Sequence, residues 1–133
     1  MAILGMGIDI VENYRFKKIL LKKRSNFKKK IFTINEVAYC EKKSNSISCY
    51  SKRFAAKEAF ATALGIGFNK NINFRDIEVT NNTYGKPYIS INKKIANKIK
   101  ILFKVKNLIY YYLFLMKKNT LLLALLFQNN ENK

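Results

Sequence analysis

Residues 52–64, with the sequence KRFAAKEAFATAL, decide the fold. Alanine has the highest helix propensity of all residues, and it recurs through this stretch until Gly65 supplies a typical helix stop. The small side chains leave little bulk along the helix, so another stretch of backbone can approach it closely. We therefore predict a long, alanine-rich helix against which a β-sheet packs.

Residues 2–12, AILGMGIDIVE, have the period-two pattern of a β-strand. One face carries the apolar side chains, and the other carries two glycines and one carboxylate. The apolar members are Leu4, Met6, Ile8 and Ile10, and the opposite members are Gly5, Gly7 and Asp9. Two glycines beside a lone carboxylate indicate that another backbone or a ligand comes close to this strand.

Helical signals flank these two stretches. Asn13 is expected to cap a helix that runs to about Lys23, with Phe16, Ile19 and Leu20 on one face. Thr33 and Glu36 have the spacing of a capping box, which predicts a short helix through Cys40. The sequence KSNSISCYS at 43–51 is expected to be a loop.

The second half of the chain mixes strands with one more helix. Strands are expected at 74–80 and 87–91 around a turn at 81–86, which makes a hairpin. An amphipathic helix at 93–104 is expected to turn Ile95, Ile99, Leu102 and Phe103 inward. Apolar β-like runs at 107–115 and 120–127 precede a polar tail at 128–133. This order lacks a regular βαβ repeat and predicts a single α+β domain over 1–133, with a mixed or antiparallel sheet.

The composition excludes several classes of protein. The chain has no histidine and only two cysteines, which removes histidine-based catalysis and most zinc sites. No apolar run reaches the ~18 residues of a membrane-spanning helix, and the start lacks the pattern of a signal peptide. We therefore expect a soluble cytoplasmic domain that does not bind a membrane.

The net charge of +18 has two explanations, and both stay open at this point. Such a field attracts polyanions, as in a non-enzymatic nucleic-acid-binding domain. The alternative is compositional drift, because lysine, asparagine and isoleucine dominate and their codons consist mostly of A and T. Only four of the 26 basic residues are arginine, the residue best suited to base and phosphate contacts. An acidic protein partner would be attracted in either case.

Four side chains in the two deciding stretches are candidates for chemistry. Arg53 and Lys57 stand four residues apart on a helix, a spacing that suits one anionic group held between two cations. If the helix packs across the first strand, Asp9 and Glu58 converge. Two carboxylates with free positions for water and phosphate oxygens are what Mg²⁺ prefers. The alternatives are an intrahelical ion pair for Glu58 and an ordinary polar strand end for Asp9.

Four blocks of this sequence resemble the holo-acyl-carrier-protein synthases, which are short 4′-phosphopantetheinyl transferases. The blocks are GMGIDIVE at 5–12, RFAAKEAF at 53–60 with ALGIG at 63–67, FRDIEV at 74–79 and GKP at 85–87. They occur in the family's order and at its separations, and together they cover about residues 2–91. The family transfers 4′-phosphopantetheine from coenzyme A to a serine of acyl carrier protein and releases adenosine 3′,5′-bisphosphate.

The resemblance assigns roles to individual residues. It implies that Asp9 and Glu58 hold Mg²⁺, that Glu58 or a metal-bound water is the base, and that Lys57 stabilises the leaving phosphate. Cofactor contacts are implied for Arg53, Lys57, Gly65, Lys86 and Pro87. Arg15 matches a position that is expected to meet the acidic carrier protein. Family members are α+β homotrimers with active sites between subunits, so a homotrimer is expected.

The C-terminal segment departs from the family. Its members end with a strand approximating Ser-x-Ser-His/Asp-Glu and then Tyr-Ala-x-Ala, whereas residues 110–127 are YYYLFLMKKNTLLLALLF. The codons of 112–121 are compatible with the family's ending when they are translated from one nucleotide earlier. Either about 108–133 is an out-of-frame translation, or a leucine-rich replacement supplies two apolar strands.

Overall fold

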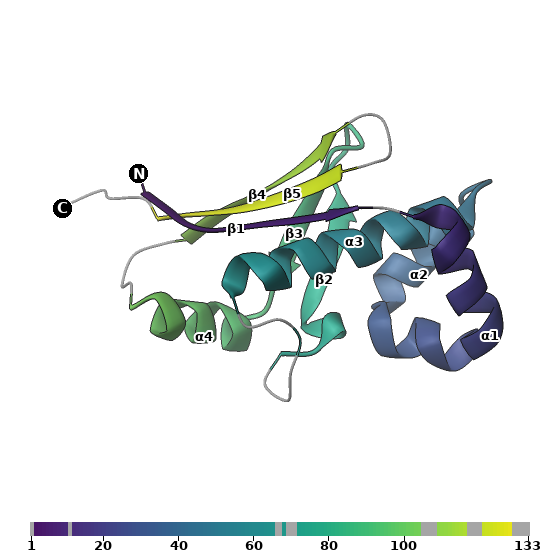
Figure 1. Cartoon of the computed structure of the whole chain (residues 1–133), viewed down its shortest axis with the longest axis horizontal. Helices are drawn as coiled ribbons and strands as arrows, with labels where there is room; N and C mark the ends of the chain where they lie inside the picture. The colour runs from purple at the N-terminus through teal and green to yellow at the C-terminus, as the bar shows by residue number, and fades with distance from the viewer. Residues whose placement is uncertain are drawn as a thin grey trace.

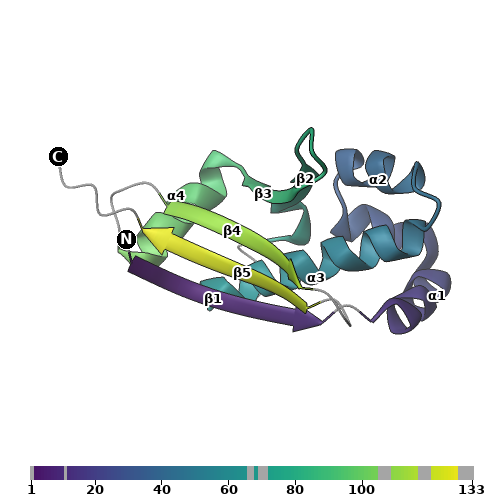
Figure 2. The same cartoon turned by 90° about the horizontal axis from the view of Figure 1, so that it is seen from above.

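A β-sheet lies across one long central helix, and smaller elements surround the two ends of that helix (Figures 1 and 2). The computed structural model describes residues 2–10, 12–65, 68, 72–104, 109–116 and 121–128. Within those ranges, residues 2–3, 23–25, 109–116 and 121–128 are described by their backbone alone. The α+β class predicted from the sequence is confirmed.

The central helix is α3 (Ser46–Leu64), which begins earlier than predicted. The Asn45 side chain caps it by accepting a hydrogen bond from the Ser48 N–H, so the loop expected at 43–51 is wrong from residue 46 onward. Polar Asn and Ser favour helix caps and turns equally, and here the cap prevails because Cys49 and Tyr50 are buried on the new first turns. Gly65 ends α3 in the left-handed conformation, as expected.

Strand β1 (Ala2–Ile10) packs directly on α3 through its glycines. A Cβ atom on Gly5 would overlap the carbonyl oxygen of Ala63, and one on Gly7 would overlap that of Ala59. This confirms the close backbone approach expected from the glycine and alanine pattern. The opposite face of β1 leaves Met6, Ile8 and Ile10 about half exposed.

The main sheet is antiparallel, in the order β1-β5-β4. β4 (Ile109–Met116) and β5 (Leu121–Gln128) come from the two predicted apolar runs. Strand β5 lies between the other two and pairs Asp9 with Leu122. The predicted tail beyond Gln128 lies outside the described residues.

Helices α1 (Asn13–Ile31) and α2 (Ile34–Glu41) lie beside the N-terminal half of α3 (Figure 1). α1 was expected to end near Lys23, but its apolar face continues to Phe27 and Ile31 at helical spacing, and burial of that face extends the helix. Asn13 is the first helical residue and does not cap α1; its side chain accepts a hydrogen bond from the Ser51 hydroxyl.

The predicted capping box at the start of α2 is confirmed, since Thr33 and Glu36 exchange both hydrogen bonds. Cys40 near the end of α2 forms a disulfide with Cys49 in α3, a pairing that the sequence analysis did not predict. The two helices are therefore joined covalently beside the first turns of α3.

A two-stranded sheet and a short helix complete the fold. The predicted hairpin is confirmed as β2 (Ile77–Asn81) and β3 (Pro87–Ile91). The first strand was expected to begin at residue 74, but residues 74–76 form a 3-10 helix, η1 (Phe74–Asp76). α4 (Lys93–Phe103) buries Ile95 and Ile99, but Leu102 is exposed, contrary to expectation. No helix among the described residues is long and apolar enough to cross a membrane.

Candidate functional site

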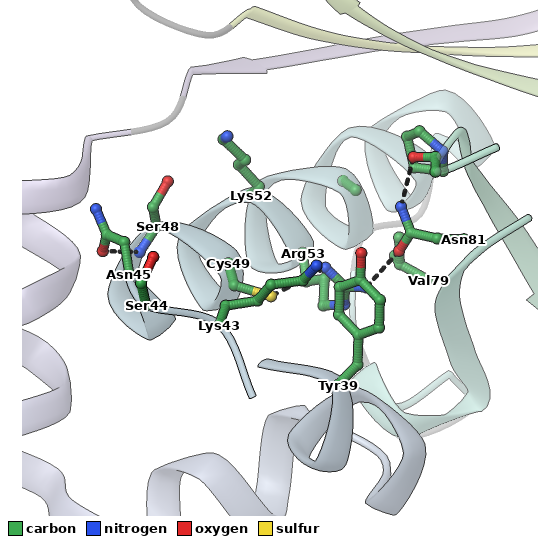
Figure 3. Close-up of a pocket in the computed structure, with 13 residues that line it drawn as sticks. Tyr39, Lys43, Ser44, Asn45, Ser48, Cys49, Lys52, Arg53, Val79 and Asn81 are labelled. Carbon is green, nitrogen blue, oxygen red and sulfur yellow. Dashed lines mark hydrogen bonds between the residues drawn. The ribbon is translucent and has the colours of Figure 1, made fainter. Parts of the chain in front are cut away.

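A cavity of about 370 Å³ lies between α2, the first half of α3 and the β2–β3 hairpin (Figure 3). Its wall combines cationic, amide and hydroxyl side chains. The lining residues are Tyr39, Lys43, Ser44, Asn45, Ser48, Cys49, Lys52, Arg53, Ala56, Val79, Asn81, Gly85 and Pro87. Three of these residues are cationic and none is acidic, so the cavity is suited to an anionic ligand.

Arg53 is the central cation of this cavity, and it is only 6% exposed. Its guanidinium lies over the Tyr39 ring, 4.3 Å from the centroid, and its Nη1 donates to the Cys49 Sγ at 3.3 Å. Burial lowers the pKa of Arg53 from its ordinary value, and the nearby Glu36 carboxylate opposes this change. The buried Nε–H has no partner among the described residues. A buried donor without an acceptor is costly, so this N–H is a polar group left unsatisfied beside the cavity.

Asn81 connects Arg53 to the hairpin turn. The Arg53 Nη2 donates to the Asn81 side-chain oxygen at 2.6 Å, and the Asn81 amide nitrogen donates to the Gly85 carbonyl at 2.9 Å (Figure 3). Gly85 makes the turn in the left-handed conformation, with a φ of 82°. The cation and the turn therefore occupy fixed positions relative to one another.

Asp9 and Glu58 are the candidate metal ligands. Each carboxyl group is only partly buried, and burial is the main cause that raises the pKa of both. The negative charge of Asp9 raises the pKa of Glu58 further, so the two groups are close enough to repel one another. None of the ion pairs among the described residues includes either carboxylate.

This donor set fits a hard divalent cation. Magnesium binds through one or two carboxylates and keeps its other positions for water and substrate phosphate. Among the described residues there is no group of three or more His, Cys, Asp or Glu side chains that could hold a metal ion. A second hollow, of about 540 Å³, extends from Asp9 along α1 past Arg15. Arg15 is well exposed there and forms an ion pair with Glu12 at 3.5 Å.

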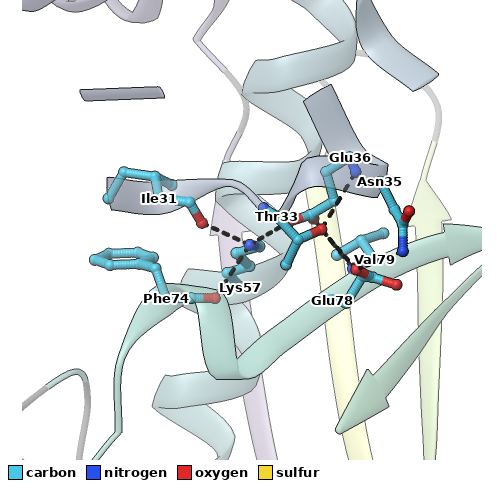
Figure 4. A network of polar contacts seen from close by, with 8 residues as sticks. All are labelled: Ile31, Thr33, Asn35, Glu36, Lys57, Phe74, Glu78 and Val79. Atoms are coloured by element: carbon cyan, nitrogen blue, oxygen red, sulfur yellow. Dashed lines mark hydrogen bonds and ion pairs between the residues drawn. The ribbon is translucent and has the colours of Figure 1, made fainter. Parts of the chain in front are cut away.

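Lys57 does not reach the cavity, so the expected phosphate site between Arg53 and Lys57 is not formed. The Lys57 ammonium is fully buried and donates to the Glu36 carboxylate and to the carbonyls of Ile31 and Phe74 (Figure 4). Burial lowers the pKa of Lys57, and the Glu36 charge opposes that change. Three acceptors satisfy the three N–H donors, so nothing remains to bind a ligand.

Of the other residues expected to contact the cofactor, some line the cavity and some do not. Pro87 lines the cavity, but Gly65 lies at the C-terminus of α3 and lines neither of the two hollows. The side chain of Lys86 is exposed, and its backbone N–H donates to Asn82 in the turn. Tyr39 and Asn81 could not be predicted from the sequence, because an isolated aromatic or amide residue carries no spacing signal of its own.

The cavity residues at 45–49, which were not predicted, lie in a stretch whose apolar spacing indicates a helix. Asn45 precedes Ile47, Tyr50 and Phe54, whose spacings of three and four are those of a helix face. Because 43–51 was interpreted as a loop, Ser48 and Cys49 were not placed beside Arg53. Extending the alanine-rich helix back by two turns would have placed both residues on its first turns.

Comparisons with known proteins identify the family of this chain. The sequence pattern of the 4′-phosphopantetheinyl transferase superfamily matches residues 5–116. The holo-[acyl-carrier-protein] synthase of Pelagibacter ubique is 47% identical over 111 residues, which are 84% of this chain and 85% of that protein. The synthase of Wigglesworthia glossinidia brevipalpis is 46% identical over 107 residues, 77% of each chain.

Solved structures give the same result. The crystal structure of holo-[acyl-carrier-protein] synthase from Neisseria meningitidis superimposes with a TM-score of 0.76 at 27% identity, covering 94% of this chain and 98% of that one. The Bacillus anthracis synthase, in complex with CoA (3′,5′-ADP), has a TM-score of 0.67 at 32% identity and covers 93% and 94%. An enzyme family thus replaces the alternative of a nucleic-acid-binding domain. The chain belongs to the 4′-phosphopantetheinyl transferase superfamily, among the holo-[acyl-carrier-protein] synthases.

Proposed function

We propose that this chain transfers 4′-phosphopantetheine from coenzyme A to a serine hydroxyl of acyl carrier protein, with Mg²⁺ held by Asp9 and Glu58. The observation that carries the proposal is Arg53, a cation only 6% exposed in the wall of a cavity that no acidic side chain lines. Lys43 and Lys52 line the same cavity. Phosphate groups of coenzyme A are ligands of the matching charge, and guanidinium groups bind phosphate oxygens well.

Asp9 and Glu58 would be the protein ligands of the metal. A bound Mg²⁺ supplies charge neutralisation at the pyrophosphate of coenzyme A. In the transfer, the serine oxygen forms a bond to the pantetheine phosphorus while the bond to the second phosphate breaks, which leaves adenosine 3′,5′-bisphosphate. Glu58 or a metal-bound water is the proposed acceptor of the serine proton.

The carrier protein is proposed to dock along α1. Arg15 is exposed at the start of that helix and borders the hollow that leads to Asp9. The +18 charge of the chain favours an acidic partner and speeds its encounter. Charge thus guides the carrier serine toward the metal side of the site.

We further propose that three copies assemble through the outer face of β1. Met6, Ile8 and Ile10 form an apolar row on that face, each about half exposed. Burial of such a row against a second copy would remove apolar area from water, which favours association. The family resemblance makes a homotrimer the expected assembly.

Two expectations from the sequence stay predictions. One is the cytoplasmic location. The other concerns the C-terminal segment, whose backbone forms β4 and β5 within the single domain proposed for 1–133. Sequencing of the coding DNA tests the frame: a homopolymer slip near codons 104–112 supports an out-of-frame translation of about 108–133. Codons incompatible with Ser-Ile-Ser before the codon of Met116 would contradict it.

The transfer assay tests the proposed function directly. Purified protein, coenzyme A, apo acyl carrier protein and Mg²⁺ are mixed, and intact-mass spectrometry follows the carrier. We expect a mass gain of one phosphopantetheine, which EDTA abolishes. Arg53→Met should raise the KM for coenzyme A by about tenfold or more, the loss expected for a charged hydrogen bond to a ligand. An unmodified carrier, or unchanged kinetics in Arg53→Met, would contradict the proposal.

A further inference from the structure

The Lys57–Glu36 pair is the most deeply buried ion pair among the described residues, and both side chains are 0% exposed. The transfer chemistry does not use it, because neither side chain lines the cavity. Burying two charges is expensive, and an apolar pair of similar size is often as stable. Stability alone is therefore a weak explanation for a buried pair at this place.

The contacts of Glu36 supply another explanation (Figure 4). One carboxylate oxygen accepts from the Thr33 N–H and from the Lys57 ammonium, at 2.9 and 2.5 Å. The other oxygen accepts from the Val79 N–H at 3.1 Å. A single carboxylate thus connects α2, α3 and β2.

The same three elements build the cavity around Arg53. α2 contributes the Tyr39 ring that stacks on the guanidinium, α3 contributes Arg53 itself, and β2 contributes Asn81, which accepts its hydrogen bond. Val79, which donates to Glu36, also lines the cavity. Arg53 lies one helical turn before Lys57 on α3, so a shift of α3 relative to β2 would displace it from Asn81.

We propose that Lys57 and Glu36 are positioning residues for the coenzyme site: they hold α2, α3 and β2 in the arrangement that aligns Tyr39, Arg53 and Asn81 with the ligand. This inference rests on the proposed function, which assigns the cavity to coenzyme A. It replaces the direct phosphate contact expected of Lys57 with an indirect effect on coenzyme binding.

Two variants separate positioning from stability. Lys57→Met alone leaves the Glu36 carboxylate buried without its cation, so the Tm should fall by more than about 10 °C. The double variant Lys57→Met/Glu36→Gln removes both charges and keeps an amide that can bond backbone groups, so most of the lost Tm should return. Glu36→Asp keeps the charge on a shorter side chain, which can reach Lys57 or Val79 but not both.

The measurements are the Tm, the KM for coenzyme A, kcat at saturating coenzyme, and the Kd of adenosine 3′,5′-bisphosphate. We expect the KM and the Kd to rise by about fivefold or more in the double variant and in Glu36→Asp, while kcat changes by less than about threefold. Lys28→Met is the matched control, since it removes the lysine of the half-exposed pair with Glu41, and its KM should not change.

Each outcome decides something. Wild-type KM and Kd in Glu36→Asp, together with wild-type values in the double variant where that variant folds, overturn the inference and leave the pair a purely structural one. If the double variant does not fold, Glu36→Asp alone decides. If the wild-type protein itself does not bind adenosine 3′,5′-bisphosphate, or if Arg53→Met binds it equally well, the proposed function fails instead.

Discussion

Gly7→Ala tests the contact that brings the first strand to the central helix. The new Cβ would overlap the Ala59 carbonyl oxygen and would lie 2.7 Å from the Ala63 nitrogen. Ordinary contacts are about 3.5–4.0 Å, so β1 must move away from α3 by about 1 Å or more. Overpacking against a rigid backbone costs about 3 kcal/mol, a large share of the stability of a domain of this size.

The assay is urea unfolding followed by far-ultraviolet circular dichroism, because the chain contains no tryptophan. Gly65→Ala is the matched control: its φ of 76° disfavours alanine, but apart from Gly65 and its chain neighbours no atom of the described residues lies within 4 Å of the added methyl group. That variant should lose only about 1 kcal/mol. Gly7→Ala should also lose transfer activity, because Asp9 is two residues farther along the displaced strand. Equal unfolding midpoints for the two variants would refute the close packing of β1 on α3.

Three further predictions concern charge and assembly. In EDTA, Glu58→Gln should be more stable than wild type above pH 6. Burial and the Asp9 charge raise the pKa of Glu58, so wild-type stability falls as pH rises through that pKa. Glu41→Gln should instead lose stability at the same pH, because hydrogen bonds from Tyr50 and Lys28 lower the pKa of Glu41. Thermal unfolding across pH measures both, and a Glu58→Gln protein less stable than wild type would contradict the first. In sedimentation velocity the wild type should be a trimer; Ile8→Lys should dissociate it, whereas Ile101→Lys, on the exposed side of α4, should not. A trimeric Ile8→Lys protein would rule out the β1 face as the interface.

Much of the framework could be predicted because it depends on local patterns. The alanine-rich helix, the capping box at Thr33 and the β2–β3 hairpin each follow from propensity or turn chemistry within a few residues. The close approach of another backbone or a ligand to β1 was also predictable from Gly5 and Gly7, and the alanines of α3 made that helix a suitable neighbour. These two elements carry both carboxylates of the proposed metal site.

The predictions were wrong where contacts between distant parts of the chain determine the structure. Lys57 was predicted to face a phosphate because spacing along a helix identifies a shared face but not the partner across it. Its partner, Glu36, is 21 residues away in sequence and was already explained by its capping role. The start of α3 was missed for a related reason, because burial of Cys49 and Tyr50 against α1 and α2 outweighs a locally polar sequence.

The central claim is that Asp9 and Glu58 share one divalent cation facing the coenzyme. The most direct measurement is titration with Mn²⁺, followed by electron paramagnetic resonance with coenzyme A present. We expect one Mn²⁺ per chain in the wild type, and at least about tenfold weaker binding in both Asp9→Asn and Glu58→Gln, because each loses a charged ligand. Glu41→Gln, a carboxylate on α2, should bind as the wild type does. Wild-type affinity in both Asp9→Asn and Glu58→Gln would contradict the claim.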